Sequence, residues 1–340
     1  MPVTPRVSVI LTVHKRTQFL AEALESVLAQ IYRDYEIIVA DDSGTAAARH
    51  IVAACGSADR VRYQPNPRTL GIAVSLVRAV QQAGGEYVAI LNDDDVWERD
   101  LLAKLVAPLE SNHNCVLATS DHWIMDESGR IDVGLSEAWS VNFGRASLQE
   151  GIVSNTAEFA VGKGGPPINI SSVFRKDAID WSLMVRDVSG AYDYWIACLL
   201  AATRQPIYYV PERLARWRTH CEMETRRRAH NKAENLVYIY SVLREREWFP
   251  ELQGAIKAKL AEALFVVGRD KLHFNHLREA RSNFWHCFLL TRSPRALARA
   301  AITFLPHTVR MRLRACLTML RTSSDEEKGG SGAAEPLFRV

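Results

Sequence analysis

The chain has 340 residues, of which 48% are hydrophobic and 24% charged, so it can form a folded core and is not expected to be disordered. Its six cysteines include no Cys-x-x-Cys pair, which argues against a zinc-ribbon site and a disulfide scaffold. The formal net charge is +3, but residues 280–324 contain eight arginines and no Asp or Glu. The rest of the chain has 34 basic and 39 acidic residues, so the positive charge belongs to the C-terminal segment.

The first 110 residues alternate short apolar runs with helical patterns. Buried strands are predicted at 7–13, 35–40, 61–63 and 87–91, and amphipathic helices at 19–28, 46–54, 72–82 and 98–110. Strands and helices that alternate at this spacing indicate an α/β fold, with a parallel sheet and helices on both of its faces.

The pattern changes after residue 115. We predict strands at 115–119, 170–174 and 207–210, a helix at 193–203, and a hairpin with arms 123–125 and 131–133 around a turn at 126–129. Residues 134–168 are predicted to be irregular, and their Gly/Pro-rich end at 162–167 is interpreted as a binding loop in preference to a linker. Helices are expected from 225 to 321, followed by a polar, Gly-rich tail.

Polar side chains follow three of the predicted strands. Thr12 and His14 follow the first strand, Asp42 the second, and residues 92–95 (Asn-Asp-Asp-Asp) the fourth. In an open parallel sheet, ligands bind at the carboxyl ends of the strands. The three clusters therefore mark one candidate site at a single edge of the sheet.

Three consecutive carboxylates, Asp93, Asp94 and Asp95, repel one another, so the folded state needs a cation or hydrogen bonds beside them. Oxygen ligands without Cys or clustered His suit Mn²⁺ or Mg²⁺, which commonly bridge to phosphate oxygens. The chain has neither G-x-G-x-x-G nor G-x-x-x-x-G-K-[ST], so a nucleotide must be held by the metal and by side chains. For Asp95, capping of the 98–110 helix is the alternative interpretation.

An ordered series of motifs resembles the family 2 glycosyltransferases of the GT-A fold. The motifs are VSVILT at 7–12, IVADDSG at 38–44, GEYVAILNDDD at 85–95, ISSVFR at 170–175, YDYW at 192–195 and RWRTH at 216–220. The resemblance implies a Rossmann-like domain that transfers sugars from nucleoside diphosphates. We expect this GT-A domain at 1–222, a basic α-helical extension at 223–322 and a disordered tail at 323–340.

The resemblance also implies roles for individual residues. The donor nucleotide is expected to contact Thr12, Asp42, Asn92, Asp93 and Arg218. His14 is a further candidate for a phosphate contact, although its place in a loop is an equally good explanation. Asp94 and His220 match the metal-ligand positions, with Mn²⁺ or Mg²⁺ as the cofactor. Asp193 matches the general base, for which the alternative is the N-cap of a helix at 194–203.

Three positions depart from the family pattern. Asn92 stands at the first position of the usual Asp-x-Asp-Asp motif, Tyr192 replaces His in a His-Asp-Trp-Trp pattern, and Val77 stands where many members have Asn. These departures keep open the alternative of a binding protein that has lost turnover.

We therefore predict an inverting, metal-dependent glycosyltransferase that moves a sugar from a UDP- or dTDP-type donor to a hydroxyl group of a glycan or lipid-linked acceptor. The expected setting is bacterial-type glycan or polysaccharide assembly. Two alternatives stay open: a nucleotidyltransferase that acts on sugar phosphates, and a non-catalytic, membrane-docked protein that binds sugar nucleotides.

The basic segment at 280–324 suits the surface of an anionic membrane, and a core-packed helix with a solvated arginine face explains it equally well. No recognition motif for nucleic acid accompanies the charge, so no nucleic-acid partner is predicted. The chain shows no secretion signal and no run of about 18 apolar residues. We expect a cytoplasmic protein, with peripheral contact at the inner membrane face as the alternative that stays open.

Overall fold

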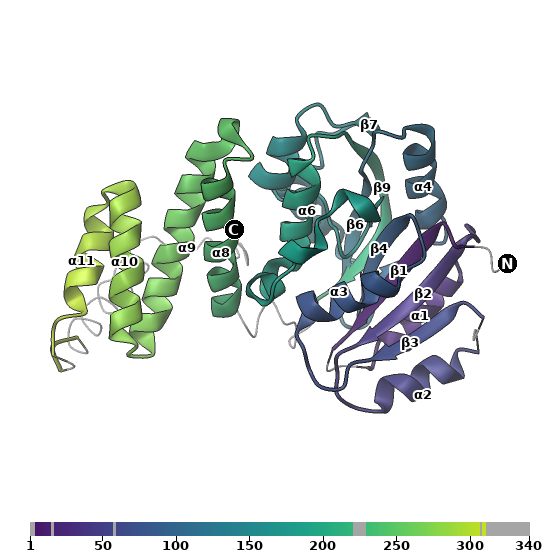
Figure 1. The fold of residues 1–340 in the computed structure, drawn as a ribbon, viewed down its shortest axis with the longest axis horizontal. Helices are drawn as coiled ribbons and strands as arrows, with labels where there is room; N and C mark the ends of the chain where they lie inside the picture. Colours follow the sequence, from purple (N-terminus) through teal and green to yellow (C-terminus); the bar gives the residue numbers. More distant parts are fainter. Residues whose placement is uncertain (1–3, 15–16, 57–58, 220–228, 307, 311–340) are drawn as a thin grey trace. The chain divides into compact units, whose positions relative to one another are not determined.

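The computed structural model describes residues 4–14, 17–56, 59–219, 229–306 and 308–310 (Figure 1). The chain divides into two compact units. The first unit comprises Met1–Ile239 and Arg246–Leu252, and the second comprises Tyr240–Glu245 and Gln253–Val340. The domain boundary predicted at residue 222 and the tail predicted at 323–340 lie outside the described residues, so both stay predictions.

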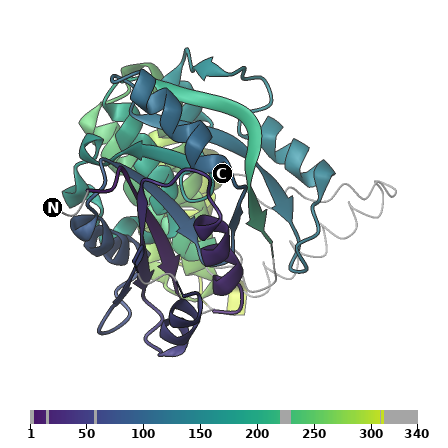
Figure 2. The same ribbon diagram turned by 90° about the vertical axis from the view of Figure 1, so that its right-hand side faces the viewer.

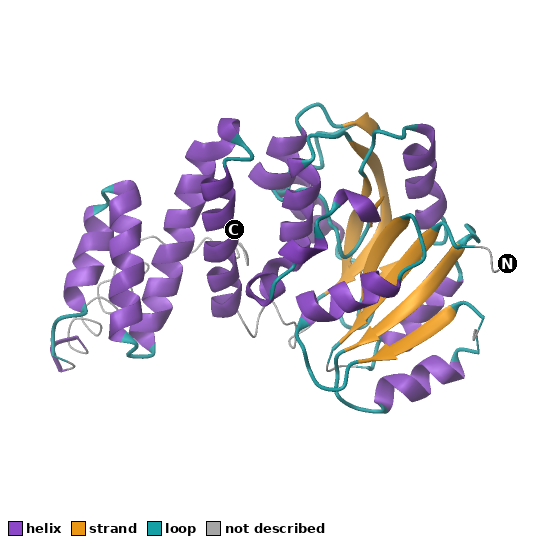
Figure 3. Cartoon of the chain, viewed as in Figure 1, coloured by secondary structure: helices purple, strands orange, loops and turns teal. Residues whose placement is uncertain are grey.

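One mixed sheet forms the centre of the first unit (Figure 3). Its strand order is β3-β2-β1-β4-β8-β6-β9-β5, and β7 pairs with β9. The strands are β1 Val7–Val13, β2 Tyr35–Asp41, β3 Val61–Pro65, β4 Tyr87–Asn92, β5 Val96–Trp97, β6 Leu117–Met125, β7 Gly151–Ile152, β8 Ser172–Arg175 and β9 Ile207–Arg218. The predicted parallel sheet is confirmed for β1 to β4, whereas β8 runs antiparallel to both β4 and β6.

Helices surround the sheet in the first unit and make up the described part of the second. The first unit contains α1 Leu20–Leu28, α2 Ala47–Ala54, α3 Ile72–Gln82, α4 Leu101–Ser111, α5 Val133–Asn142 and α6 Tyr192–Ala202. The second contains α9 Gln253–His273, α10 Leu277–Thr291 and α11 Pro294–Ile302, while α8 Ala229–Arg246 is divided between the units. The α/β fold class and the helical C-terminal region are confirmed.

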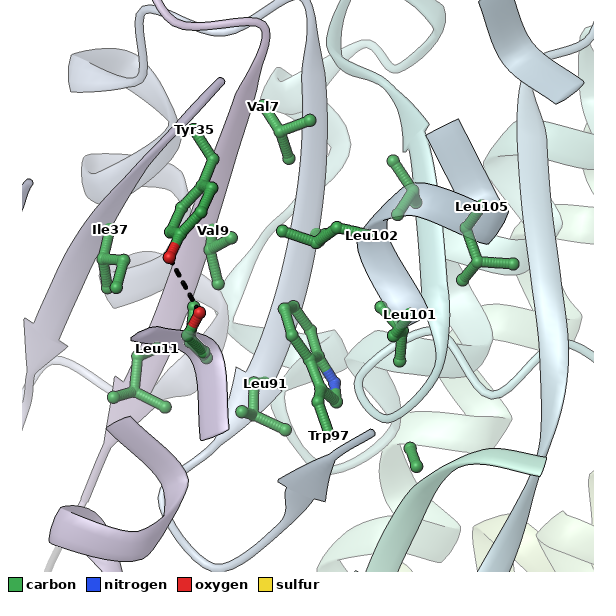
Figure 4. Packing of buried hydrophobic residues seen from close by; sticks show 14 of the residues in the cluster. Val7, Val9, Leu11, Tyr35, Ile37, Leu91, Trp97, Leu101, Leu102 and Leu105 are labelled. Atoms are coloured by element: carbon green, nitrogen blue, oxygen red, sulfur yellow. Dashed lines mark hydrogen bonds between the residues drawn. The ribbon is translucent and has the colours of Figure 1, made fainter. Parts of the chain in front are cut away.

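Alternate residues of β1 face opposite sides of the sheet, as the period of two requires. Val7, Val9 and Leu11 are buried in one apolar cluster with residues of α1 and α4, including Leu102 (Figure 4). The hydroxyl of Tyr35 in this cluster donates a hydrogen bond to the carbonyl oxygen of Val27 at 2.9 Å. Each fully buried side chain of this kind stabilises the fold by about 1.5–3 kcal/mol, which fixes the strands whose ends carry the candidate site.

The region predicted to be irregular, 134–168, contains the helix α5, so that prediction is wrong. The apolar pattern does not reveal α5 because its buried residues are Ser136 and Ser140, whereas Val133 and Val141 are exposed. The hydroxyl of Ser136 accepts a hydrogen bond from the Ile124 amide at 2.8 Å. Hydrogen bonds therefore take the place of apolar contacts on the inner face of this helix.

Strand β6 is continuous, although two separate strands at 115–119 and 123–125 were expected. The sequence between them, Ser120-Asp121-His122, is polar, yet all three residues are buried. Strand β9 pairs with β6 over nearly its whole length with register shifts near Asp121, and Figure 2 shows the resulting curve of this long strand. The predicted turn at 126–129 is present, but its second arm contributes only a single bridge before α5 begins.

The Gly/Pro-rich stretch at 162–167 is packed inside the first unit. Gly165, Pro166 and Pro167 are buried, and a Cβ atom at Gly165 would lie 2.0 Å from the ring of Phe159. The segment is therefore part of the domain core and does not act as a linker. Its role as a binding loop stays a prediction.

A buried polar network connects β6 with α5 and the loop that follows it. Asp121 accepts hydrogen bonds from Arg145 Nε at 2.8 Å and from the hydroxyl of Ser140. The neighbouring His122 is buried, and neither of its ring nitrogens has a hydrogen-bond partner among the described residues. Burial lowers the pKa of His122 well below its usual value, and the cations of Arg145 and Arg213 lower this pKa further.

This lowered pKa makes the stability of the first unit depend on pH. Below about pH 6.5 the unfolded chain binds a proton at His122 that the folded chain rejects. The free energy of unfolding should therefore decrease as the pH falls below 6.5, by up to about 1.4 kcal/mol per pH unit. His122→Phe should remove this component in urea titrations between pH 5 and 7.5. The exposed His113→Phe is the matched control, and equal pH slopes in the two variants would contradict the prediction.

Candidate functional site

The ends of β1 and β4 bring four of the predicted site residues together. Thr12 lies opposite Asn92 in the parallel register, and its hydroxyl donates to Asn92 Oδ1 at 3.0 Å. The amide of His14 donates to Asp93 Oδ2 at 3.1 Å. The polar edge expected from the sequence therefore forms where the two strands end.

Asp42, at the end of β2, is committed to the loop before α3. Its carboxylate accepts hydrogen bonds from the Leu70 amide at 2.7 Å, the Gly71 amide at 2.8 Å and Asn66 Nδ2 at 2.9 Å. Gly71 has a φ of 92°, which a residue with a side chain rarely adopts. Asp42 thus fixes the loop that leads into α3, and its contact with a nucleotide stays a prediction.

The three aspartates after β4 differ in burial. Asp94 is half-buried, Asp93 is buried, and Asp95 is fully buried. Burial raises the pKa of Asp95 well above its usual value, and the negative charge of Asp94 adds to this shift. Helix α4 begins at Leu101, so the interpretation of Asp95 as its N-cap is wrong.

Arg218, the last residue of β9, holds this acidic loop in place. Its backbone amide donates to Asp95 Oδ1 at 2.9 Å, and its Nε donates to the carbonyl oxygen of Asp94 at 2.9 Å. Its Nη1 and Nη2 donate to the Glu127 carbonyl oxygen at 3.2 Å and to Glu22 Oε2 at 2.6 Å. Only 2% of Arg218 is exposed. Arg218 is therefore a positioning residue. Its predicted direct contact with the donor nucleotide stays a prediction.

Glu22 is a site residue that the sequence did not indicate. It lies in the first turn of α1, where an acidic side chain is normally explained by the helix dipole. Only the fold brings it to Arg218, which is 196 positions further along the chain.

The first turn of α6 meets the end of β4. The hydroxyl of Tyr192 donates to Asn92 Oδ1 at 3.0 Å, so two of the departures from the family pattern contact each other. Helix α6 starts at Tyr192 with Ala191 as its N-cap, so the interpretation of Asp193 as an N-cap is wrong. Asp193 is half-buried and has no hydrogen bond to any residue that the structure describes.

The structure leaves the predicted metal site incomplete. His220 lies outside the described residues, and within the described part of the chain no group of three or more His, Cys, Asp or Glu side chains is arranged to hold a metal ion. The Oδ2 atom of Asp95 is buried and has no hydrogen-bond partner in that part. An unpaired carboxylate oxygen beside Asp93 and Asp94 fits a divalent cation, because hard cations prefer oxygen ligands.

Comparisons of the sequence show which known proteins this chain resembles. Residues 8–159 match the family model described as Glycosyl transferase family 2. The putative glycosyltransferase EpsE of Bacillus subtilis (strain 168) is 32% identical over 127 residues, which cover 37% of this chain and 46% of EpsE. The putative teichuronic acid biosynthesis glycosyltransferase TuaG of the same organism is 29% identical over 126 residues, which cover 37% of this chain and 50% of TuaG. The matched part thus spans at most half the length of these two relatives.

Solved structures resemble the chain over most of its length. S. aureus TarS 1–349 in complex with UDP-GlcNAc has a TM-score of 0.58 at 15% identity and covers 91% of this chain and 92% of its own. The mannosyltransferase PcManGT from Pyrobaculum calidifontis, in complex with GDP-Man and Mn²⁺, has a TM-score of 0.54 at 17% identity, over 88% of this chain and 79% of its own. These likenesses confirm the GT-A fold.

The bonds of Arg218 predict a large loss of stability when its guanidinium is removed. Each buried polar group left without a partner costs about 1–3 kcal/mol, so Arg218→Met should lower the free energy of unfolding by about 2–5 kcal/mol in urea titrations. Arg216→Met is the matched control on the same strand. It breaks only a partly exposed ion pair with Glu98, at 2.8 Å, and should cost at most about 1 kcal/mol. Equal losses in the two variants would contradict the positioning role.

Proposed function

We propose that this protein, whose residues 8–159 match the model of glycosyl transferase family 2, transfers a sugar from a nucleoside-diphosphate donor to an acceptor hydroxyl group, with inversion and with the aid of a divalent cation. The observation that carries the proposal is the hydrogen bond between Tyr192 and Asn92. It connects the first turn of α6, which carries Asp193, to the strand end that precedes Asp93 and Asp94. A carboxylate base beside a site for a diphosphate is what a single displacement needs.

Asp193 takes the proton of the acceptor hydroxyl group in this proposal. Its half-buried carboxylate is not engaged by any described side chain, so its oxygens are available as proton acceptors. A single base is sufficient for a displacement with inversion, because no covalent intermediate has to form. Asp193 therefore supports inversion as well as catalysis.

The acidic loop binds the diphosphate end of the donor. Asp94 and His220 would hold Mn²⁺ or Mg²⁺, which stabilises the negative charge of the departing diphosphate. Thr12, His14 and Asp93 lie at the same strand end and bind the nucleotide part. Two further predicted donor residues act indirectly, since Asp42 orders the loop before α3 and Arg218 fixes the backbone of Asp94.

The similar proteins support a narrower choice of substrates. The solved structures of TarS and PcManGT are complexes with UDP-GlcNAc and GDP-Man, so a nucleoside-diphosphate sugar is the proposed donor. Sugars linked to UDP and dTDP are the first donors to test. The name of TuaG refers to teichuronic acid biosynthesis. We accordingly place this protein in bacterial-type polysaccharide assembly, with a glycan or lipid-linked acceptor.

A basic, aromatic stripe on α10 supports contact with an anionic membrane surface. Trp285 and Leu289 are 47% and 45% exposed, Arg281 lies one turn before them on the same side of the helix, and Arg292 is the residue that caps the end of the helix. The Arg281 guanidinium lies 3.6 Å from the ring centre of Phe304, which is 69% exposed. Arginines beside exposed aromatic rings suit lipid headgroups.

None of the described helices is long and apolar enough to cross a bilayer. Residues 311–324 of the basic segment lie outside the described part of the chain.

The base role of Asp193 predicts a separation of binding from turnover. Asp193→Asn should bind UDP or dTDP with Mn²⁺ as the parent does in calorimetry, and should lose about 10²- to 10⁴-fold in nucleoside-diphosphate release from a panel of sugar nucleotides and glycans. The exposed Asp187→Asn is the matched control and should keep its activity. Full activity of Asp193→Asn would contradict the assignment. Release of pyrophosphate would favour the nucleotidyltransferase, and binding of nucleoside diphosphates without any turnover of the parent would favour the binding protein.

The stripe on α10 predicts selective binding to anionic vesicles. Parent protein should sediment with vesicles that contain phosphatidylglycerol and not with pure phosphatidylcholine. The double variant Trp285→Ala, Leu289→Ala should weaken this binding about tenfold or more, since two large apolar side chains are withdrawn from the interface. Val141→Ala, at a 66% exposed position of α5, is the control. Equal binding to both kinds of vesicle would contradict membrane contact.

A further inference from the structure

A hollow of about 640 Å³ lies where β6 and β9 meet α5 and the loop that follows it. Its volume is within the range of sites that bind small molecules, about 300–1,000 Å³. None of the residues predicted to hold the donor or the metal lines it. The hollow is thus a second concave surface of the first unit, separate from the strand end that carries Thr12 and Asp93.

Positive charge predominates at the buried end of the hollow. Asp121 is paired with Arg145 Nε at 2.8 Å and lies 3.6 Å from Arg213 Nε, so two guanidinium groups share one carboxylate. Asp121 and Arg145 are both almost fully buried. Burial is the main reason that the pKa of the neighbouring His122 is lowered, and the charges of these two arginines lower it further.

One donor of this cluster has no partner. Arg145 Nη1 donates to the carbonyl oxygen of Gly165 at 2.9 Å and Nε donates to Asp121, but Nη2 is buried without a hydrogen-bond partner among the described residues. A buried donor left unpaired costs about 1–3 kcal/mol. An anionic oxygen of a ligand bound against this wall of the hollow would lie beside the guanidinium groups of Arg145 and Arg213.

The remaining lining adds rings and neutral polar groups. Trp123 and Tyr209 contribute aromatic surface, with the Arg213 guanidinium 4.3 Å from the ring centre of Trp123. Two carboxylates also line the hollow: Glu212 is paired with Lys104 at 2.5 Å, and Glu137 is exposed. The buried end therefore has two guanidinium groups around one carboxylate, whereas the lining as a whole has two arginines and three carboxylates. Rings beside hydrogen-bonding groups suit a sugar, which presents both C–H faces and hydroxyl groups.

We propose that this hollow binds a saccharide unit that carries a carboxylate or phosphate group, and that it recognises an anionic acceptor glycan. The second part rests on the proposed function. A chain of neighbouring residues connects the hollow to the base. Arg145 Nη1 donates to the carbonyl oxygen of Gly165, a Cβ atom at the adjacent Gly164 would lie 3.6 Å from the ring of Tyr194, and Tyr194 follows Asp193 on α6.

Binding of small anionic sugars to the full chain tests the proposal. In calorimetry or saturation-transfer NMR, methyl glucuronide or glucose 6-phosphate should bind at least tenfold more tightly than methyl glucoside. The difference in affinity between methyl glucuronide and glucose 6-phosphate shows whether the hollow prefers a carboxylate or a phosphate group. Arg213→Gln should weaken the anion at least tenfold and leave UDP binding with Mn²⁺ unchanged. Arg216→Gln, which removes the same charge from the same strand but does not line the hollow, should change neither.

A second variant tests the hollow in case Arg213→Gln fails to fold. Leu148→Trp places a large ring in the hollow at a partly exposed position, and it should block the sugar while UDP still binds. Equal binding of the neutral and anionic sugars, unchanged binding by both variants, or no sugar binding in protein that binds UDP would each overturn the proposal and leave the proposed function standing. Binding of the anionic sugars by protein that binds no nucleotide would support the sugar site in the hollow and contradict the proposed donor site.

Discussion

The buried guanidinium of Arg218 is the group on which the candidate site depends. Three consecutive aspartates after β4 would repel one another and take up water if they were left alone. Arg218 bonds the backbone of Asp94 through Nε and the carboxylate of Asp95 through its amide, and both contacts come from the far end of β9. Because β9 is held in place by its pairing with β6, the acidic loop acquires its shape only when the second half of the sheet has formed. The site is therefore a product of the whole first unit and not of the N-terminal strands alone.

The first half of the fold was predictable from the sequence because its burial follows simple periods. The predicted helix at 72–82 and strand at 7–13 have the observed bounds, since most of their buried side chains are apolar. The second half was not predictable in the same way. Helix α5 buries serines, so the apolar pattern predicts a loop there. Strand β6 buries Ser120-Asp121-His122, so the same pattern predicts a break between two strands.

The sequence indicated which residues gather at the site but not what they bond. Asn92 and Tyr192 each depart from the family pattern when considered singly, and each then suggests lost activity. Together they form one hydrogen bond, and Asn92 Oδ1 also accepts the hydroxyl of Thr12. A carboxamide oxygen can accept both bonds, so the two departures are matched to each other. Such a matched pair preserves the position of α6 against β4, and this geometry argues against decay of the site.

The places where hydrophobic patterning failed coincide with the places where the structure holds buried charge. Burying Asp121 and Arg145 costs solvation free energy, and an apolar pair of similar volume would often serve stability as well or better. At the end of β9, the guanidinium of Arg218 is buried as well, and the amide of Arg218 bonds the buried carboxyl group of Asp95. Local rules are broken mainly where a protein needs a polar surface for another purpose. One such cluster borders the acidic loop and the other borders the hollow, so the departures from simple packing in β6 and β9 coincide with the proposed donor site and the proposed second site.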